Sequence, residues 1–98
     1  MSDRYRLRVI AVTARQWTGL NDTELTMFAE TRFMTVPAEE RDDDPYETAA
    51  LLESYHDSWL GLRPGDWVVR DEQGAFSRVR GEAFPKTFEP VADEEQQP

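Results

Sequence analysis

Short runs in which hydrophobic and polar residues alternate, separated by glycine and proline, dominate this 98-residue chain. Such alternation is typical of β-strands, because successive side chains of a strand point to opposite faces of a sheet. The runs occupy residues 5–17, 31–37, 67–70 and 75–79. In the first run the alternation gives way toward the middle to apolar residues at successive positions, so that both sets of alternate residues are apolar. This predicts a strand covered on both faces. The pattern therefore indicates a largely β domain.

Residues 20–29 have helical spacing instead. Leu25, Phe28 and Ala29 recur at intervals of three and four residues and so share one face of a helix. A helix of about two turns is not stable by itself, so we expect this face to pack on the sheet.

The start of this helix carries a recognisable signal. Asn21 suits the N-cap, and Glu24 falls where a side chain can reach back to the amide of the capping residue. Leu20 and Leu25 occupy the positions of a hydrophobic staple, in which two apolar side chains pack across the helix start. We therefore expect both a capping box and a staple.

Residues 45–62 fit two structures. In a helix, Pro45 would take the first position, where an amide hydrogen is not needed. In a β-hairpin, a tight turn at residues 56–57 would be flanked by Tyr55 and Trp59, and alternation would continue on both sides. We favour the hairpin, and the sequence alone leaves the helix open.

The stretch LRPGDWVVRDEQGAFSRV is the most regular part of the chain. Pro64 presets the backbone for the second position of a turn, and Gly65 supplies the positive φ that a type II turn needs next. We expect strands at 67–70 and 75–79, joined by the loop 71–74.

With a four-residue loop, Val69 pairs with Phe76 and Trp67 pairs with Arg78. Trp67, Val69 and Phe76 then share an apolar face that we expect to be buried against the helix. Arg78 would stack on the indole of Trp67 as a cation–π pair. We therefore interpret this part of the sequence as scaffold rather than as a binding site.

The fold is expected to close with a single helical turn that has Phe84 and Phe88 on one face and Pro90 as its stop. Residues 1–91 are expected to form one small domain, and residues 92–98 a disordered polar tail. The predicted fold class is α+β, with a mostly antiparallel sheet of four to six strands, one short packed helix and this C-terminal helical turn.

The formal net charge is −9, from 20 acidic and 11 basic side chains. Acidic residues crowd the segment 37–48, which we expect to be a solvated loop because like charges repel one another and resist burial. An acidic domain is a poor match for phosphates, so direct nucleic-acid binding is not expected. Mimicry of nucleic acid by an acidic face is an alternative.

The chain contains no cysteine, which excludes disulfides, thiolate metal sites and a cysteine nucleophile. No run is long and apolar enough for a membrane-spanning helix, and the first residues do not read as a signal peptide. We expect a protein of the cytoplasm, that of the host cell if a phage encodes it.

No set of residues has the spacing of a catalytic or metal site. His56 is the only histidine, and its neighbours Asp57 and Ser58 cannot complete a triad, because consecutive residues do not converge on one substrate. The run 42–44 is acidic but lacks the spaced ligands and the glycine of a calcium loop. We therefore predict no catalytic, metal-binding or cofactor-binding residues, and no enzyme.

Three tryptophans, Trp17, Trp59 and Trp67, are many for so short a chain. Core packing accounts for most of them, but Trp59 adjoins a turn and is expected to be the most exposed. Tryptophan and arginine are favoured anchors of protein interfaces, so the candidate interaction residues are Trp59, Trp67, Arg70 and Arg78. A free sheet edge also favours a homodimer.

Several motifs occur in an order that resembles a widespread family of small, uncharacterised phage and prophage proteins. They are RYR at 4–6, VIAVTARQWTG at 9–19, PGDWVVR at 64–70, and Phe84 followed by TFEPV at 87–91. The resemblance covers both ends and the centre of the chain. It implies no activity, cofactor or catalytic residue.

The chain departs from this family pattern in two informative ways. Arg15 stands where a small apolar residue is common, and the stretch 37–61 is longer and more acidic than the usual strand. All basic residues except Lys86 are arginine. Together these features resemble an actinobacterial or actinophage branch.

These observations favour a non-catalytic phage or prophage accessory protein that binds a macromolecular partner, for example to modulate a host process or a defence system. One alternative is a protein that binds or sequesters a small ligand such as a nucleotide. Its pocket would need Arg70, Arg78 or the group Arg4, Arg6 and Arg8 to converge. A minor virion component is a further alternative.

Overall fold

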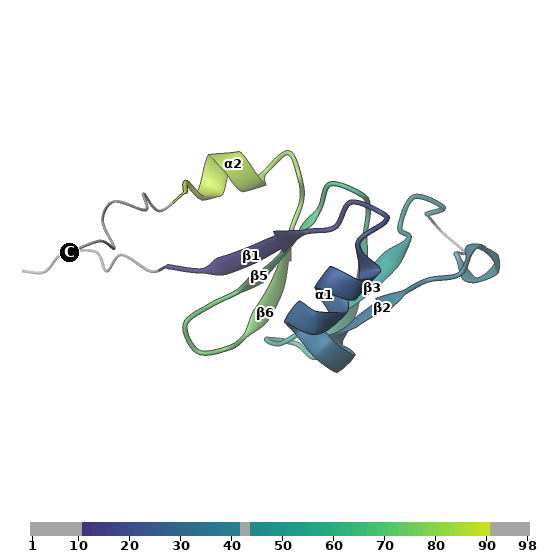
Figure 1. Cartoon of the computed structure of the whole chain (residues 1–98), viewed down its shortest axis with the longest axis horizontal. Helices are drawn as coiled ribbons and strands as arrows, with labels where there is room; N and C mark the ends of the chain where they lie inside the picture. Colours follow the sequence, from purple (N-terminus) through teal and green to yellow (C-terminus); the bar gives the residue numbers. More distant parts are fainter. Residues whose placement is uncertain (1–10, 42–43, 91–98) are drawn as a thin grey trace, which may run out of the picture.

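The computed structural model describes residues 11–41 and 44–90 (Figure 1). Six antiparallel strands form two three-stranded sheets, with strand orders β1-β5-β6 and β2-β3-β4. The predicted α+β class is confirmed, and the strands divide between two sheets where the sequence predicts one. In chain order the elements are β1 (Thr13–Gln16), α1 (Asp22–Ala29), β2 (Phe33–Thr35), β3 (Ala49–Glu53), β4 (Ser58–Leu62), β5 (Trp67–Arg70), β6 (Phe76–Val79) and α2 (Phe84–Thr87).

The first two strands are shorter than their alternating runs. β1 covers the end of the run 5–17, whose beginning lies outside the described residues. β2 starts only at Phe33, because a 3-10 turn occupies Glu30–Arg32, and it ends at Thr35, ahead of Pro37, which cannot donate to a sheet. Alternation within β2 is also as predicted, since Phe33 is buried and Met34 is exposed.

A hydrophobic core joins α1 to residues from both sheets. α1 contributes Leu25 and Ala29, with Phe28 packed at the margin, so the predicted helical face is confirmed. Trp17 is 2% exposed, and its indole N–H donates to the hydroxyl of Thr48 at 2.9 Å. The core residues are Trp17, Leu25, Ala29, Phe33, Ala49, Leu51, Leu62, Val68 and Phe76.

The predicted capping box and hydrophobic staple at the start of α1 are both wrong. The side chain of Asn21, the N-cap residue, bonds to no helix amide: its Oδ1 accepts the amide and the hydroxyl of Thr18, and its Nδ2 donates to the carbonyl of Gln16 and to Glu24. Leu20 is 91% exposed, so no staple forms. Hydrogen bonds from Thr18 to Oδ1 therefore replace the expected bonds from the helix amides, and a bond to Gln16 ties the residue to the end of β1.

The turn that precedes β5 has the predicted type II geometry. Gly65 has a φ of 105°, and the amide of Asp66 donates to the carbonyl of Arg63 at 2.9 Å. The amide of Gly65 donates to the carbonyl of Trp17, and the amide of Trp17 donates to the carbonyl of Asp66. These bonds extend the β1–β5 ladder into the turn.

The predicted register of the β5–β6 hairpin is wrong by one residue. The observed pairs are Trp67–Val79, Val68–Arg78, Val69–Ser77 and Arg70–Phe76. Phe76 and Trp67 therefore lie on opposite faces of the sheet, and Arg78 does not stack on Trp67.

Asp71 is the physical reason for this shift. Its backbone amide donates to the carbonyl of Ala75 at 3.0 Å, and its Oδ1 accepts the amides of Gln73 and Ala75. Gly74 closes the turn with a φ of 85°. The loop therefore contains five residues, because the carboxylate of Asp71 holds Ala75 within it.

The shift divides the predicted apolar face between the two sides of the sheet. Val68 and Phe76 join the core, where the Phe76 ring meets Phe28 edge-on at 5.7 Å. Trp67 lies on the other side and stacks on Phe84, with ring centroids 4.0 Å apart and planes at 9°. Burial of Trp67 against α1, as the sequence predicts, is therefore wrong.

The C-terminal helical turn is confirmed as α2, which lies over the β1-β5-β6 sheet (Figure 1). Phe84 and Phe88 share one side of it, with ring centroids 5.1 Å apart. The helix ends at Thr87, ahead of Pro90.

Residues 45–62 form the hairpin and not the helix. Its turn spans 54–57, so Tyr55 lies within the turn, and the prediction that Tyr55 flanks a tight turn at 56–57 is wrong. Buried Glu53 stabilises this turn, because its carboxylate accepts the amide of Tyr55 and both the amide and the ring Nδ1 of His56. His56 is therefore a turn residue, as predicted.

Candidate functional site

The candidate site is the face of the β2-β3-β4 sheet that points away from the core. Met34, Ala50 and Gly61 align across the three strands, and Leu52 pairs with Trp59. Alternate residues on the same strands point into the core, so these five lie on the opposite side. We call these five positions the outer face.

No position of the outer face carries a polar side chain. An antiparallel sheet that covers a core with one face usually exposes polar residues on the other. Here Trp59 is 49% exposed and Met34 is 46% exposed, while Leu52 is half-buried. Large apolar side chains therefore meet water where polar ones are expected.

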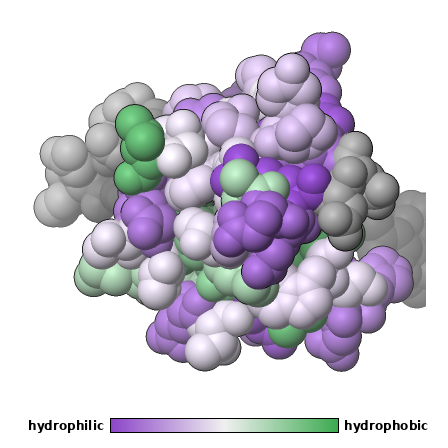
Figure 2. Space-filling model, turned by 90° about the vertical axis from the view of Figure 1, so that its right-hand side faces the viewer, coloured by the Kyte–Doolittle hydropathy of each residue, from purple (hydrophilic) through white to green (hydrophobic). Residues whose placement is uncertain are grey.

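A hollow of about 250 Å³ borders the outer face at Ala50 and Gly61. The carboxylate of Glu47 lies over Gly61, where a Cβ atom would come within 2.1 Å of its Oε1. The hollow is further lined by Val36, Glu40, Arg41, Asp44 and Ala49. Viewed from the end that carries the loop after β2, the surface is mainly hydrophilic, with separate hydrophobic patches (Figure 2).

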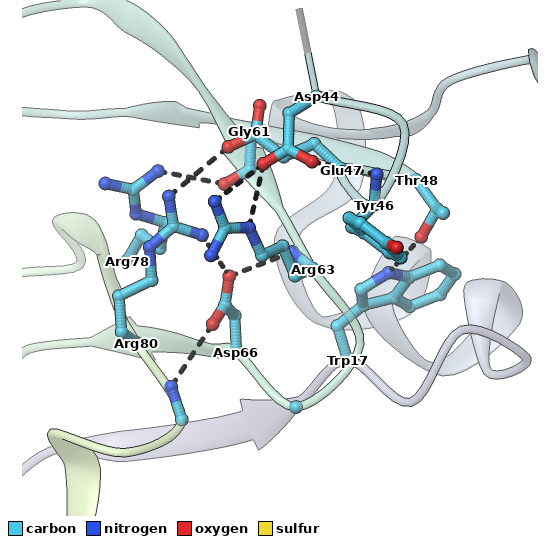
Figure 3. A network of polar contacts seen from close by, with 12 residues as sticks. Trp17, Asp44, Tyr46, Glu47, Thr48, Gly61, Arg63, Asp66, Arg78 and Arg80 are labelled. Carbon is cyan, nitrogen blue, oxygen red and sulfur yellow. Dashed lines mark hydrogen bonds and ion pairs between the residues drawn. The ribbon is translucent and has the colours of Figure 1, made fainter. Parts of the chain in front are cut away.

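A network of arginines and carboxylates lies beside this hollow (Figure 3). Its centre is Asp66, whose exposed fraction is 4%. One carboxylate oxygen accepts the amide of Arg63 at 2.8 Å and a guanidinium N–H of Arg80, and the other accepts the amide of Gly81 at 3.1 Å. The carboxylate therefore joins the turn before β5 to the segment after β6.

The network extends to the loop before β3. Arg63 pairs with Asp44 at 2.6 Å, and Arg80 pairs with Glu47 at 3.3 Å. A hydrogen bond from the Tyr46 amide and the contact with Arg63 lower the pKa of Asp44. The charged form of Asp44 is therefore favoured, which suits a structural connection between segments.

Arg78 takes a different position in the network. Its Nη1 donates to the carbonyl of Gly61 at 2.9 Å, at the edge of β4. Burial and the neighbouring Arg80 lower the pKa of Arg78. The guanidinium therefore closes part of the β4 edge rather than presenting a free binding group.

The four predicted interaction residues do not come together. Only Trp59 belongs to the outer face. Trp67 is half-buried against α2, and Arg70 lies over the ring of Phe28 with its guanidinium carbon 4.8 Å from the centroid. Arg78 binds the backbone of β4.

The sequence analysis missed Met34 and Leu52, which lie on the same face as Trp59. The signal was present in the run AALLE of β3, where both phases of the alternation are apolar. Such a run predicts a strand with apolar neighbours on both faces. Only the pairing of β3 with β2 and β4 shows which phase faces water.

A second, wider hollow of about 520 Å³ lies between the start of α1 and the end of β2. Its lining residues are Trp17, Gly19, Leu20, Asp22, Thr35, Val36, Pro37, Arg41, Thr48 and Pro64. Arg70 and Arg78, named above for a ligand pocket, line neither hollow. The group Arg4, Arg6 and Arg8 lies outside the described residues.

Within residues 11–41 and 44–90, no three histidine, aspartate or glutamate side chains are grouped to hold a metal ion. Of the acidic run 42–44, Asp44 alone is described, and it pairs with Arg63. In the same part of the chain, no helix has the length and apolar character needed to cross a membrane.

Comparison with models of protein families gave no match, and neither did comparisons with curated proteins and with solved structures. The resemblance to small phage and prophage proteins therefore stays a prediction from the sequence motifs.

Proposed function

We propose that the protein acts without catalysis, by binding a protein partner through the outer face, as an accessory protein of a phage or prophage. One observation carries the proposal: none of the five positions of the outer face has a polar side chain of its own, and Trp59 and Met34 are about half exposed. The Glu47 carboxylate covers this face at Gly61. Apolar surface of this kind on a small protein is typical of an interaction site.

The chemistry of the outer face suits an anchor. Tryptophan is enriched among the residues that contribute most to protein interfaces, since it buries a large area with few rotatable bonds. Leu52 flanks Trp59 across the strand pair, and both belong to a hairpin whose turn is held by Glu53. A partner would therefore meet a rigid, preformed surface.

The proposal is tested with Trp59→Ala and Met34→Ala as immobilised baits, beside the wild-type protein. Met27→Ala is the matched control, because Met27 is 77% exposed on α1 and lies outside the outer face. Proteins captured from a lysate of the bacterial host are quantified by mass spectrometry. We expect a partner retained by wild type and Met27→Ala to fall about tenfold or more with Trp59→Ala.

Thermal unfolding of each bait checks that it is folded. We expect similar melting temperatures for all of them, because exposed side chains contribute little to stability. If all four baits retain the same proteins in the same amounts, the outer face is not the binding surface.

A further inference from the structure

The balance of charges around the outer face indicates which kind of partner fits it. Building on the proposed function, we infer that the partner presents a basic protein surface, with lysine or arginine side chains around an apolar centre. The inference depends on where the acidic and basic groups of this chain point, and on which of them already have partners.

The arginines of the described residues are used inside the molecule. Arg63 and Arg80 pair with carboxylates, and Arg70 lies over an aromatic ring beside Arg15. The remaining three, Arg32, Arg41 and Arg78, each donate to a backbone carbonyl. These contacts use the donor groups of the arginines to hold the fold, and the charges of Arg63 and Arg80 are balanced by carboxylates.

Many carboxylates, in contrast, form no ion pair. Among residues 11–41 and 44–90, nine acidic side chains take part in no ion pair. Asp71 accepts the hydroxyl of Tyr55, and the other eight are Asp22, Glu30, Glu39, Glu40, Asp57, Glu72, Glu82 and Glu89. The same residues include fourteen acidic and eight basic side chains. The described residues therefore carry an excess of six negative charges, fourteen less eight.

Two of these carboxylates lie near the ends of the outer face. Glu40 lines the hollow that borders Ala50 and Gly61. Asp57 lies in the β3–β4 turn, two positions before Trp59. An apolar strip with acidic groups near both ends is complementary to a basic surface with an apolar centre.

The negative charge of the chain also disfavours two other partners of the outer face, a second copy of the chain and a nucleic acid. Two copies of a chain with a net charge of −9 repel each other, and nucleic-acid phosphates meet the same repulsion. Pairing of β4 with a second copy would also compete with Arg78, which already binds the carbonyl of Gly61.

Two synthetic amphipathic peptides with identical apolar residues test the inference, one with lysine and one with glutamate at every polar position. Binding is followed by NMR of the three tryptophan indole N–H signals. Trp17, bonded to Thr48, and Trp67, stacked on Phe84, serve as internal references. We expect the lysine peptide to shift the Trp59 signal saturably and the glutamate peptide to leave it unchanged.

Raising the salt concentration from about 0.05 M to 0.5 M should weaken lysine-peptide binding about tenfold, because salt screens exposed charges. Trp59→Ala should weaken it similarly, whereas Met27→Ala should not; because Trp59→Ala lacks the reporting signal, the affinities of both variants are measured by the fluorescence anisotropy of a dye-labelled lysine peptide. Equal binding of both peptides, binding unaffected by salt, or binding of the lysine peptide unaffected by Trp59→Ala would each overturn the inference.

The remaining outcomes separate the inference from the proposed function. If Trp59 shifts with protein concentration alone, the occupant is a second copy and the basic partner is rejected. If neither peptide binds but Trp59→Ala still loses a captured partner, the partner surface is not basic, whereas binding through the outer face is supported. If neither peptide binds and capture is unchanged, both fail.

Discussion

At the scale of single residues, Asp66 shows how a short motif acts as scaffold. In the sequence it follows the Pro-Gly turn and precedes Trp67, where it reads as one more polar turn residue. In the fold it is buried and accepts hydrogen bonds from Arg63, Arg80 and Gly81. A buried carboxylate with such partners is costly to alter, because each donor would be left without its acceptor.

Replacement of this carboxylate should be strongly destabilising. In Asp66→Asn the charge that balances Arg80 is lost, and the new amide places donors against donors, so we expect a loss of about 3 kcal/mol in the free energy of unfolding. Urea unfolding followed by tryptophan fluorescence measures it. Glu72→Gln, in the exposed β5–β6 loop, is the control and should change stability by less than about 0.5 kcal/mol. Equal losses in both variants would contradict the role given to Asp66.

At the scale of elements, close approaches between segments decide which small residues are required. Gly81 follows β6 and lies against the turn before β5, where an added Cβ would come within 2.6 Å of the carbonyl oxygen of Gly65. Gly61 on β4 is equally crowded, but the atoms over it belong to the flexible end of Glu47. The two glycines therefore differ in what must move.

This difference predicts unequal effects of the same substitution. Gly81→Ala must displace backbone and should cost about 1–3 kcal/mol. Gly61→Ala displaces only the Glu47 carboxylate and its partly exposed contact with Arg80, which contributes at most about 1 kcal/mol. Denaturant unfolding of both variants gives the comparison. A larger loss for Gly61→Ala would show that Glu47 is held more firmly than its contacts indicate.

At the scale of the whole molecule, carboxylates connect the turns and loops of both sheets. Burial opposes ionisation of Glu53, but the amides of Tyr55 and His56 and the His56 ring outweigh it and lower its pKa below the ordinary 4.5. Asp71 accepts the hydroxyl of Tyr55 and loop amides, which lowers the pKa of Asp71 below 3.8 and raises that of Tyr55. Ionised carboxylates thus favour the folded state.

Stability should therefore fall in acid. A carboxyl group with a lower pKa in the folded state binds protons more readily when unfolded, so its contribution is present above the ordinary pKa and is lost as pH falls through the folded value. We expect the free energy of unfolding to drop steadily from about pH 4.5 downward, as measured by urea titration at successive pH values. Glu53→Gln should flatten this drop, and a curve parallel to that of the wild type would argue against Glu53 as a contributor.

Much of the local structure could be predicted from the sequence because neighbouring residues decide it. The type II turn at Pro64–Gly65 follows from the backbone preferences of those two residues. The apolar face of α1 follows from spacing, and the exposure of Trp59 follows from its place beside a turn. In each case the determining groups lie within a few residues of one another.

What only the tertiary structure decided involves competition between distant groups. The sequence could not show that Asp71 retains Ala75 in its loop, which changes the strand register. It also could not show that Asn21 bonds to the end of β1 rather than to the amides of its own helix. Nor could it show which apolar phase of β3 faces water, since that depends on pairing with β2 and β4. Periodicity thus determines which residues share a face, while packing of the sheets determines which face a partner can reach.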